Sequence, residues 1–163
     1  MSKESPKTPK TTRRAFLASA AAFPLFTIVP RHVLAASGQA APSDKLSMGC
    51  IGVGGMMGGS DVDGVSGENI YALCDVDANH LGEMVKRFPN AKVYRDYREM
   101  LDKEHKNLDA VTVTTPDHMH ASIALRAMER GLSVHCQKPL TQTVWEARLL
   151  TNAAKKYKVG TQM

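Results

Sequence analysis

Short apolar segments alternate with longer amphipathic segments along most of this 163-residue sequence. The apolar segments predict six strands, which lie near residues 46–51, 69–74, 92–94, 109–114, 132–136 and 159–162. The intervening segments place apolar residues at helical spacing and predict helices near residues 56–65, 77–87, 96–104, 118–130 and 141–157. Strands and helices in regular alternation predict an α/β fold with a doubly wound parallel sheet.

A cluster of glycines follows the first predicted strand. Gly52 and Gly54 take the first two places of the spacing G-x-G-x-x-G, whereas Met57 stands at the third place and Gly58 comes one residue later. Either Met57 holds the first helix further from the strand, or Gly58 provides the close packing. Asp75 ends the second strand. This order is typical of a dinucleotide site, in which a glycine turn and a helix N-terminus hold the pyrophosphate and an acid binds the ribose.

Alone, a glycine-rich segment of this kind is also compatible with a flexible loop. A second motif, Thr114-Thr-Pro-Asp-His-Met-His120, ends the fourth strand, at the edge where open α/β sheets bind ligands. Its residues either contact the cofactor or form an ordinary turn in which Thr115 or Asp117 caps the next helix. No metal site is predicted, because His118 and His120 are two residues apart and point differently on a helix.

The fifth strand ends in a third motif, Val134-His-Cys-Gln-Lys-Pro-Leu140. Lys138 is a cation at the same edge of the sheet, and it can donate to a ribose or substrate hydroxyl. The alternative is a solvated loop lysine. Pro139 fixes the turn, with a cis peptide bond as one option. The three cysteines are predicted to be buried free thiols, with a disulfide between Cys50 and Cys74 as the alternative.

Charge is distributed unevenly along the chain. The net charge of +5 comes entirely from residues 1–35, and the remainder is balanced, which argues against nucleic acid as a partner. Arg13 and Arg14 precede an apolar run that extends to about Val29, and this segment resembles a twin-arginine export signal. An amphipathic anchor or an uncleaved membrane helix is the alternative. Cleavage after Ala35 fits the small-residue rule.

The predicted organisation is therefore a twin-arginine signal peptide at 1–35, a linker at 36–45 and a dinucleotide-binding domain at 46–163. The signal predicts a periplasmic or other extracytoplasmic protein that meets the membrane only through the export machinery. Met128 and Trp145 are predicted to lie in the core of the domain rather than to contact a ligand.

Together the three motifs resemble the amino-terminal domain of the Gfo/Idh/MocA oxidoreductase family, which includes glucose–fructose oxidoreductase and inositol dehydrogenase. The resemblance covers residues 46–163, with Gln137 in place of the usual glutamate of a Glu-Lys-Pro motif. It implies Lys138 as a catalytic residue beside the nicotinamide and the substrate. The cofactor-binding residues that it implies are Gly52, Gly54, Gly55, Met56, Asp75, Thr115, Pro116, His120, Gln137 and Lys138.

By this resemblance the cofactor is NAD rather than NADP, because the carboxylate of Asp75 repels a 2′-phosphate. The full enzyme is expected to transfer a hydride to or from a hydroxyl-bearing carbon of a small sugar-like or cyclitol substrate, and to form a homo-oligomer. Family members carry a second α+β domain, which is absent from this sequence, so the chain alone is expected to be inactive. An NAD-dependent glycosidase and a non-catalytic dinucleotide-binding fragment are the alternatives.

Overall fold

The computed structural model describes residues 44–163; the predicted signal segment and most of the predicted linker lie outside the described residues. The six strands are β1 (Ser47–Ile51), β2 (Asn69–Cys74), β3 (Lys92–Tyr94), β4 (Ala110–Val113), β5 (Ser133–Cys136) and β6 (Thr161–Gln162). The helices are α3 (Gly55–Gly64), α4 (Ala78–Arg87), α5 (Tyr97–Glu104), α6 (Asp117–Met128) and α7 (Val144–Tyr157), with a 3₁₀ turn η2 (His105–Asn107) after α5. All of the predicted strands and helices are confirmed to within a few residues.

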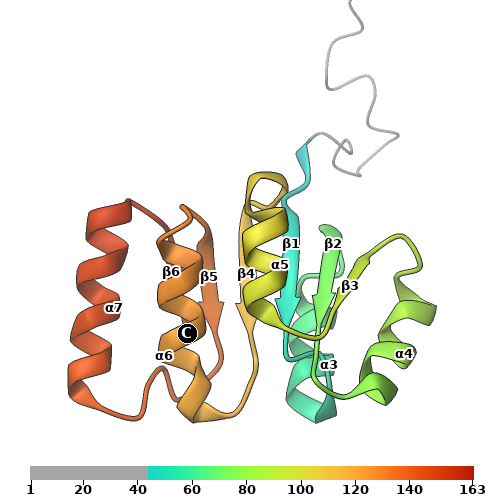
Figure 1. Ribbon diagram of the computed structural model, residues 1–163, viewed down its shortest axis with the longest axis horizontal. Coiled ribbons are helices and arrows are strands. Elements are labelled where there is room, and N and C mark those ends of the chain that lie inside the picture. Colours follow the sequence, from blue (N-terminus) through green and yellow to red (C-terminus); the bar gives the residue numbers. More distant parts are fainter. Residues whose placement is uncertain (1–43) are drawn as a thin grey trace, which may run out of the picture. The chain divides into compact units, whose positions relative to one another are not determined.

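The strands form one parallel sheet in the order β3-β2-β1-β4-β5-β6 (Figure 1). From β1 the chain first builds outward through β2 to β3, and then returns to the other side of β1 with β4, β5 and β6. The strand order therefore reverses between β1 and β4. In a doubly wound sheet this reversal opens a crevice at the carboxyl ends of the strands, so the expected Rossmann-type fold is confirmed.

Alternate residues of the central strand serve two separate cores. Met48 and Cys50 of β1 pack with α3 and α4, whereas Ile51 packs with α5 and α6 on the opposite face. The first core contains Met48, Cys50, Val53, Val62, Ile70, Leu73, Leu81 and Met84. The second includes Ile51, Met100, Leu101, Val111, Val113, Ile123, Ala127, Leu132 and Leu150. Both faces of the sheet are covered at the central strands β1, β2 and β4, whose residues are mainly buried.

A buried acid joins β2, β3 and the end of α5. Glu104 is only 5 % exposed, and its carboxylate accepts from Lys92 Nζ at 2.8 Å and from the Tyr94 hydroxyl at 2.6 Å. The Tyr71 hydroxyl and the Asn107 amide donate to the same carboxylate. The Lys92 ammonium, followed by Tyr94, lowers the pKa of Glu104 to about 2. These contacts satisfy the charge that the fold buries.

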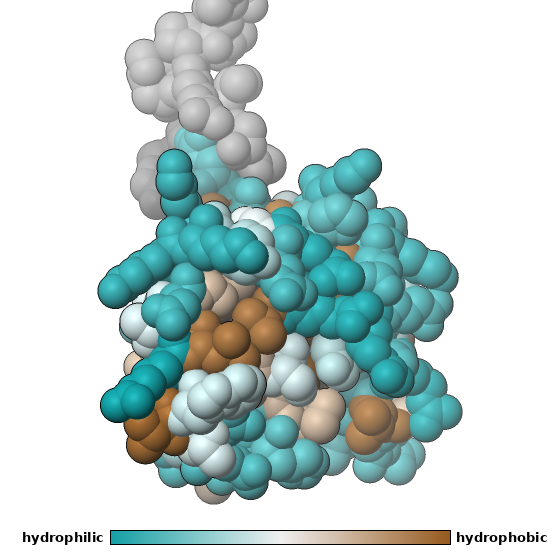
Figure 2. Space-filling model, turned by 60° about the vertical axis from the view of Figure 1, so that its left-hand side comes forward, coloured by the Kyte–Doolittle hydropathy of each residue, from teal (hydrophilic) through white to brown (hydrophobic). Residues whose placement is uncertain are grey.

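Two packing predictions have different outcomes. Met128 is buried, as predicted, but Trp145 is 70 % exposed, so its assignment to the core is wrong. Trp145 stands in the first turn of α7, where Thr143 and Glu146 form a capping box, and only Leu150 and Ala153 of that helix are buried. Figure 2 shows the side on which α7 lies, where hydrophobic residues gather within a mostly hydrophilic surface.

The three cysteines are buried free thiols, as predicted. The Lys138–Pro139 bond is cis, which was one of the options that the sequence left open. No helix within residues 44–163 has both the length and the apolar character needed to cross a bilayer.

Candidate functional site

The glycine turn after β1 is required by close contacts with neighbouring backbone. Gly52 has a φ of +80°, and a Cβ on it would lie 2.5 Å from the carbonyl oxygen of Thr114. A Cβ on Gly58 would lie 2.6 Å from the carbonyl oxygen of Gly52. Gly58 therefore provides the close packing of helix against strand, while Met57 is partly exposed. The single-residue offset in the glycine spacing leaves the turn intact.

Asp75, at the end of β2, holds the glycine turn in place. Its carboxylate accepts the backbone N–H of Gly54 at 2.9 Å through one oxygen and that of Asp77 at 2.9 Å through the other. The side chain is 11 % exposed. Each carboxylate oxygen can accept more than one hydrogen bond, so Asp75 can also receive a ribose hydroxyl.

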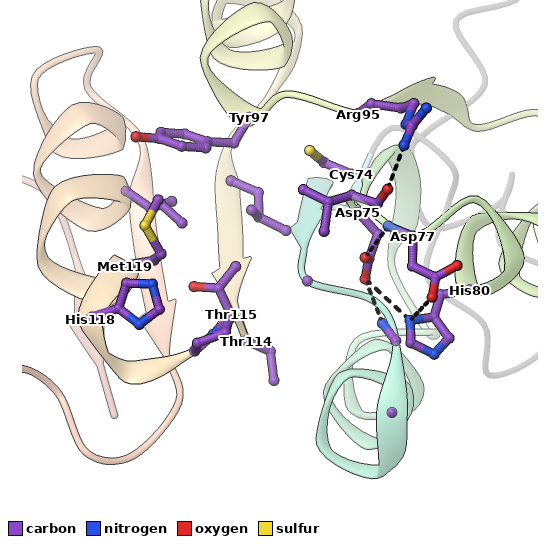
Figure 3. Close-up of a pocket in the computed structure, with 17 residues that line it drawn as sticks. Cys74, Asp75, Asp77, His80, Arg95, Tyr97, Thr114, Thr115, His118 and Met119 are labelled. Carbon is purple, nitrogen blue, oxygen red and sulfur yellow. Dashed lines mark hydrogen bonds and ion pairs between the residues drawn. The ribbon is translucent and has the colours of Figure 1, made fainter.

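These two features border a cavity of about 560 Å³ at the carboxyl ends of β1, β2 and β4, a volume suited to a small-molecule ligand. Figure 3 shows its two walls. One carries Asp75, Asp77, His80 and Arg95, and the other carries Thr114, Thr115, His118 and Met119. Cys74 also contacts the cavity; burial raises the pKa of its thiol to about 12, so the thiol stays neutral.

Two observations indicate that the cavity fits a dinucleotide. The first is the N-terminus of α3, where no side chain caps the amides and no acidic residue stands in the first turn. Such a terminus attracts the negative charge of phosphate groups. The second is Thr115, whose buried Oγ1 has no hydrogen-bond partner among the described residues. The predicted cap from Thr115 or Asp117 is wrong, since neither side chain caps α6, and the buried Thr115 hydroxyl is one that a bound group would be expected to satisfy.

The cavity brings together six of the predicted cofactor-binding residues, and their roles toward a cofactor stay predictions. They are Gly52, Gly54, Gly55, Asp75, Thr115 and Pro116. Met56 stands in the first turn of α3 with its side chain 86 % exposed, outside the cavity wall.

The other predicted residues lie behind or beyond the wall. His120 is 1 % exposed, with Nε2 2.7 Å from the carbonyl oxygen of Thr115 and Nδ1 2.7 Å from that of Pro139. It can therefore affect a ligand only through these two loops. Gln137 is half-buried, and Lys138 is exposed at the carboxyl end of β5. Among residues 44–163, His120, Gln137 and Lys138 are not part of the cavity wall.

Sequence reasoning missed several residues of the wall. The ring of His80 lies over the glycine turn, since a Cβ on Gly54 would approach its Nδ1 to 1.9 Å. Arg95 follows β3 and donates to the carbonyl oxygen of Val76 at 2.8 Å. Tyr97 opens α5 and also lines the cavity. Arg95 and Tyr97 carried a usable signal, because they follow the third strand at the same edge as Asp75 follows the second.

The fold and the site define a dinucleotide-binding domain of the Rossmann type. The chain belongs to the GFO_IDH_MocA family, described as an oxidoreductase family with an NAD-binding Rossmann fold, whose sequence profile matches residues 46–163. The family match confirms the predicted family and NAD as the cofactor class.

Individual relatives agree with this assignment. The chain is 30 % identical over 117 residues to an inositol 2-dehydrogenase of Salmonella paratyphi B, covering 68 % of this chain and 34 % of that protein. It is 34 % identical over 92 residues to a D-apiose dehydrogenase of Paraburkholderia graminis, covering 56 % and 24 %. An NAD-binding oxidoreductase from Klebsiella pneumoniae has a similar structure, with a TM-score of 0.64 and 29 % identity over 72 % of this chain and 34 % of the other. The chain thus spans about a third of the length of the curated inositol dehydrogenases that it matches.

Proposed function

We propose that this chain is the cofactor-binding part of an NAD-dependent oxidoreductase that transfers a hydride to or from a hydroxyl-bearing carbon of a sugar or cyclitol. The observation that carries the proposal is the cavity at the switch of strand order, where Asp75 meets the glycine turn and the buried Thr115 hydroxyl has no hydrogen-bond partner among residues 44–163. The names of the relatives, an inositol 2-dehydrogenase and a D-apiose dehydrogenase, support a polyhydroxylated substrate.

Binding of the cofactor rests on three groups of this chain. The open amides at the N-terminus of α3 receive the pyrophosphate, and the glycine turn allows its close approach. The carboxylate of Asp75 accepts the hydroxyls of the adenosine ribose. A 2′-phosphate at that place would meet the same negative charge, so NAD is preferred over NADP.

Lys138 is the proposed catalytic residue on the substrate side. When bound, NAD supplies the acceptor or donor for the two electrons of the hydride. In the oxidation direction the hydride would go to NAD, and the hydroxyl proton would go to a base from the second domain that family members carry. The Lys138 ammonium donates to the oxygen of the reacting hydroxyl and stabilises the negative charge that develops there as the proton leaves. The side-chain oxygen of Gln137 accepts the backbone N–H of Lys138 at 2.8 Å, and this bond helps to hold the backbone from which the Lys138 side chain extends.

Turnover should be tested on the full-length protein with a panel of cyclitols and aldoses, following NADH by its absorbance. We expect stoichiometric NADH from at least one substrate, and a Lys138→Met variant that binds NAD normally but turns over at least about 100-fold more slowly. Release of an aglycone with catalytic NAD and no net NADH would instead establish the glycosidase. Binding without any turnover would leave a dinucleotide-binding module. Light scattering on the same sample tests the expected homo-oligomer.

Export by the twin-arginine route is a separate proposal, supported by the sequence alone. Arg13 and Arg14 precede the apolar run, and an enzyme that folds around its cofactor before export suits this pathway. Replacing both arginines by lysine keeps the charge, so the paired variant should accumulate in the cytoplasm while the unaltered protein reaches the periplasm. Equal fractionation of the two would contradict the route.

A further inference from the structure

A carboxylate from the first helix contacts the ends of two strands at the candidate site. Asp61 of α3 accepts from Thr114 Oγ1, at the end of β4, at 2.6 Å. It also accepts from the side-chain nitrogen of Gln137, at the end of β5, with both carboxylate oxygens at 3.1 Å. Asp61 is far from both Thr114 and Gln137 in the sequence, so the fold brings the three side chains together.

The contact with Asp61 determines which way the Gln137 amide points. An ionised carboxylate only accepts hydrogen bonds, so it selects the NH₂ end of the amide and turns the oxygen away. That oxygen accepts the backbone N–H of Lys138 at 2.8 Å. The orientation of a backbone amide next to the proposed catalytic ammonium therefore depends on a carboxylate in another element.

The loop is also held from its other end. The carbonyl oxygen of Pro139 lies 2.7 Å from His120 Nδ1, and the second ring nitrogen of His120 lies 2.7 Å from the carbonyl oxygen of Thr115. Asp61 and His120 thus connect the Lys138 loop to the two segments that bear the glycine turn and the Thr115 hydroxyl. Lys138 itself is exposed, so its backbone is held by these partly buried contacts of the loop rather than by packing of its own side chain.

The identity of residue 137 is matched to the charge of Asp61. Within residues 44–163, no lysine, arginine or histidine nitrogen comes within 4.0 Å of the Asp61 carboxylate, so hydrogen-bond donors alone compensate it. A glutamate at position 137 would place a second carboxylate at about the same contact distance, where two like charges cannot both remain ionised without a large cost. Glutamine avoids this conflict and supplies a donor.

We propose that Asp61 is a positioning residue of this site, which acts through the Gln137 amide to fix the backbone of Lys138. The inference rests on the proposed function, because Lys138 acts on substrate only in the full oxidoreductase. The linkage itself, from Asp61 through Gln137 to the Lys138 N–H, belongs to the described domain and can be measured without turnover.

The test is a charge exchange between the two partners. Gln137→Glu, Asp61→Asn and the double variant Asp61→Asn/Gln137→Glu are compared by hydrogen exchange of the Lys138 amide in this chain, and by kcat, KM and NAD affinity in the full-length protein. Asp63→Asn is the matched control. Asp63 stands in the same helix and loses the same charge, but its partner is Arg87 and it does not contact Gln137.

Gln137→Glu should speed exchange of the Lys138 amide by about tenfold relative to amides of β2, since one hydrogen bond is lost or displaced. It should lower kcat by a similar factor while KM and NAD affinity change by less than about twofold. Adding Asp61→Asn should restore the exchange rate of the Lys138 amide and kcat to within about threefold of the wild type. In the double variant, positions 61 and 137 again hold one carboxylate and one neutral amide. Adding Asp63→Asn instead should restore neither.

Additive effects of Asp61→Asn and Gln137→Glu, with no restoration, would overturn the proposal. If Gln137→Glu fails to fold, Gln137→Met serves in its place. It removes both polar ends without a charge conflict, so it should speed Lys138 exchange and gain nothing from Asp61→Asn; rescue there would also overturn the proposal. A wild-type protein that neither binds NAD nor turns over would refute the proposed function, while amide exchange would still decide on the linkage.

Discussion

At the scale of single residues, the glycines of the turn are explained by contact rather than by flexibility. Gly52 needs a positive φ and has the Thr114 carbonyl against it, while Gly58 faces the Gly52 carbonyl. The sequence allowed two interpretations of the displaced third glycine: either Met57 holds α3 away from β1, or Gly58 packs closely against it. The spacing of the glycines does not distinguish them. The choice depends on how deeply α3 seats on β1, which is a tertiary property.

Two adjacent glycines of α3 should respond differently to replacement by alanine. Gly58→Ala should destabilise the domain by about 1–3 kcal/mol, because the new methyl group overlaps backbone that cannot move away. Gly59→Ala should instead stabilise it by about 0.5–1 kcal/mol, since its Cβ would lie 3.8 Å from Met84 Cε, an ordinary contact, and alanine favours the helix. Urea unfolding of the two variants measures both effects. Equal changes in the free energy of unfolding would contradict the assignment of Gly58.

At the scale of elements, local signals determine where the helices begin. Asp77 and Asp96 cap α4 and α5 through the backbone N–H of Asn79 and Arg98, and Thr143 with Glu146 forms the capping box of α7. Capping residues of this kind can be recognised in the sequence, so the starts of these helices could be predicted. The Glu104 cluster was not, because its partners come from two strands and a 3₁₀ turn.

The Glu104 cluster should make stability depend on pH in acid. The pKa of Glu104 is about 2 in the folded protein, against a usual 4.5. The contribution of the ionised Glu104 to the free energy of unfolding is therefore fully present above pH 4.5 and is lost as the pH falls towards 2. Glu104→Gln should therefore lower the free energy of unfolding by about 1–3 kcal/mol at neutral pH. The difference between variant and wild type should shrink between pH 4.5 and 2.

Glu99→Gln is the control for this experiment. Glu99 pairs with Lys103 on the exposed face of the same helix, with side chains 51 % and 61 % exposed. Its removal should change the free energy of unfolding by less than about 0.5 kcal/mol at any pH. A Glu104→Gln effect that is equally small, or that does not depend on pH, would contradict the role assigned to the cluster.

At the scale of the whole molecule, the order of elements predicted the sheet, and the sheet predicted where the site lies. The predicted motifs after β1, β2 and β4 meet at one cavity, because parallel strands present their carboxyl ends at one edge. Arg95 and Tyr97 complete the wall only because β3 pairs with β2. The exposed Trp145 was not predictable either, since helix periodicity does not say where the covered face ends.

The two-sided core makes thiol reactivity a measure of global unfolding. Burial raises the pKa of Cys50 and Cys136 to about 11 and that of Cys74 to about 12, so all three thiols are neutral near pH 8. Cys50 and Cys136 do not line the cavity, whereas Cys74 does. We expect a disulfide reagent to label neither Cys50 nor Cys136 in the native protein within minutes, and all three thiols in urea. NAD should slow the residual labelling of Cys50 and Cys136, because it binds the folded state. Rapid labelling of Cys50 or Cys136 in the native protein would contradict this packing.

Calorimetric titration of NAD into this chain measures whether the cavity beside Asp75 is the NAD site. One NAD should bind per chain, NADP should bind at least about tenfold more weakly, and the Asp75→Asn variant should lose about tenfold or more in NAD affinity. Asp63 lies outside the cavity, so the Asp63→Asn variant should bind NAD as the wild type does. The absence of NAD binding, or an NAD affinity that Asp75→Asn leaves unchanged, would contradict the assignment of this cavity.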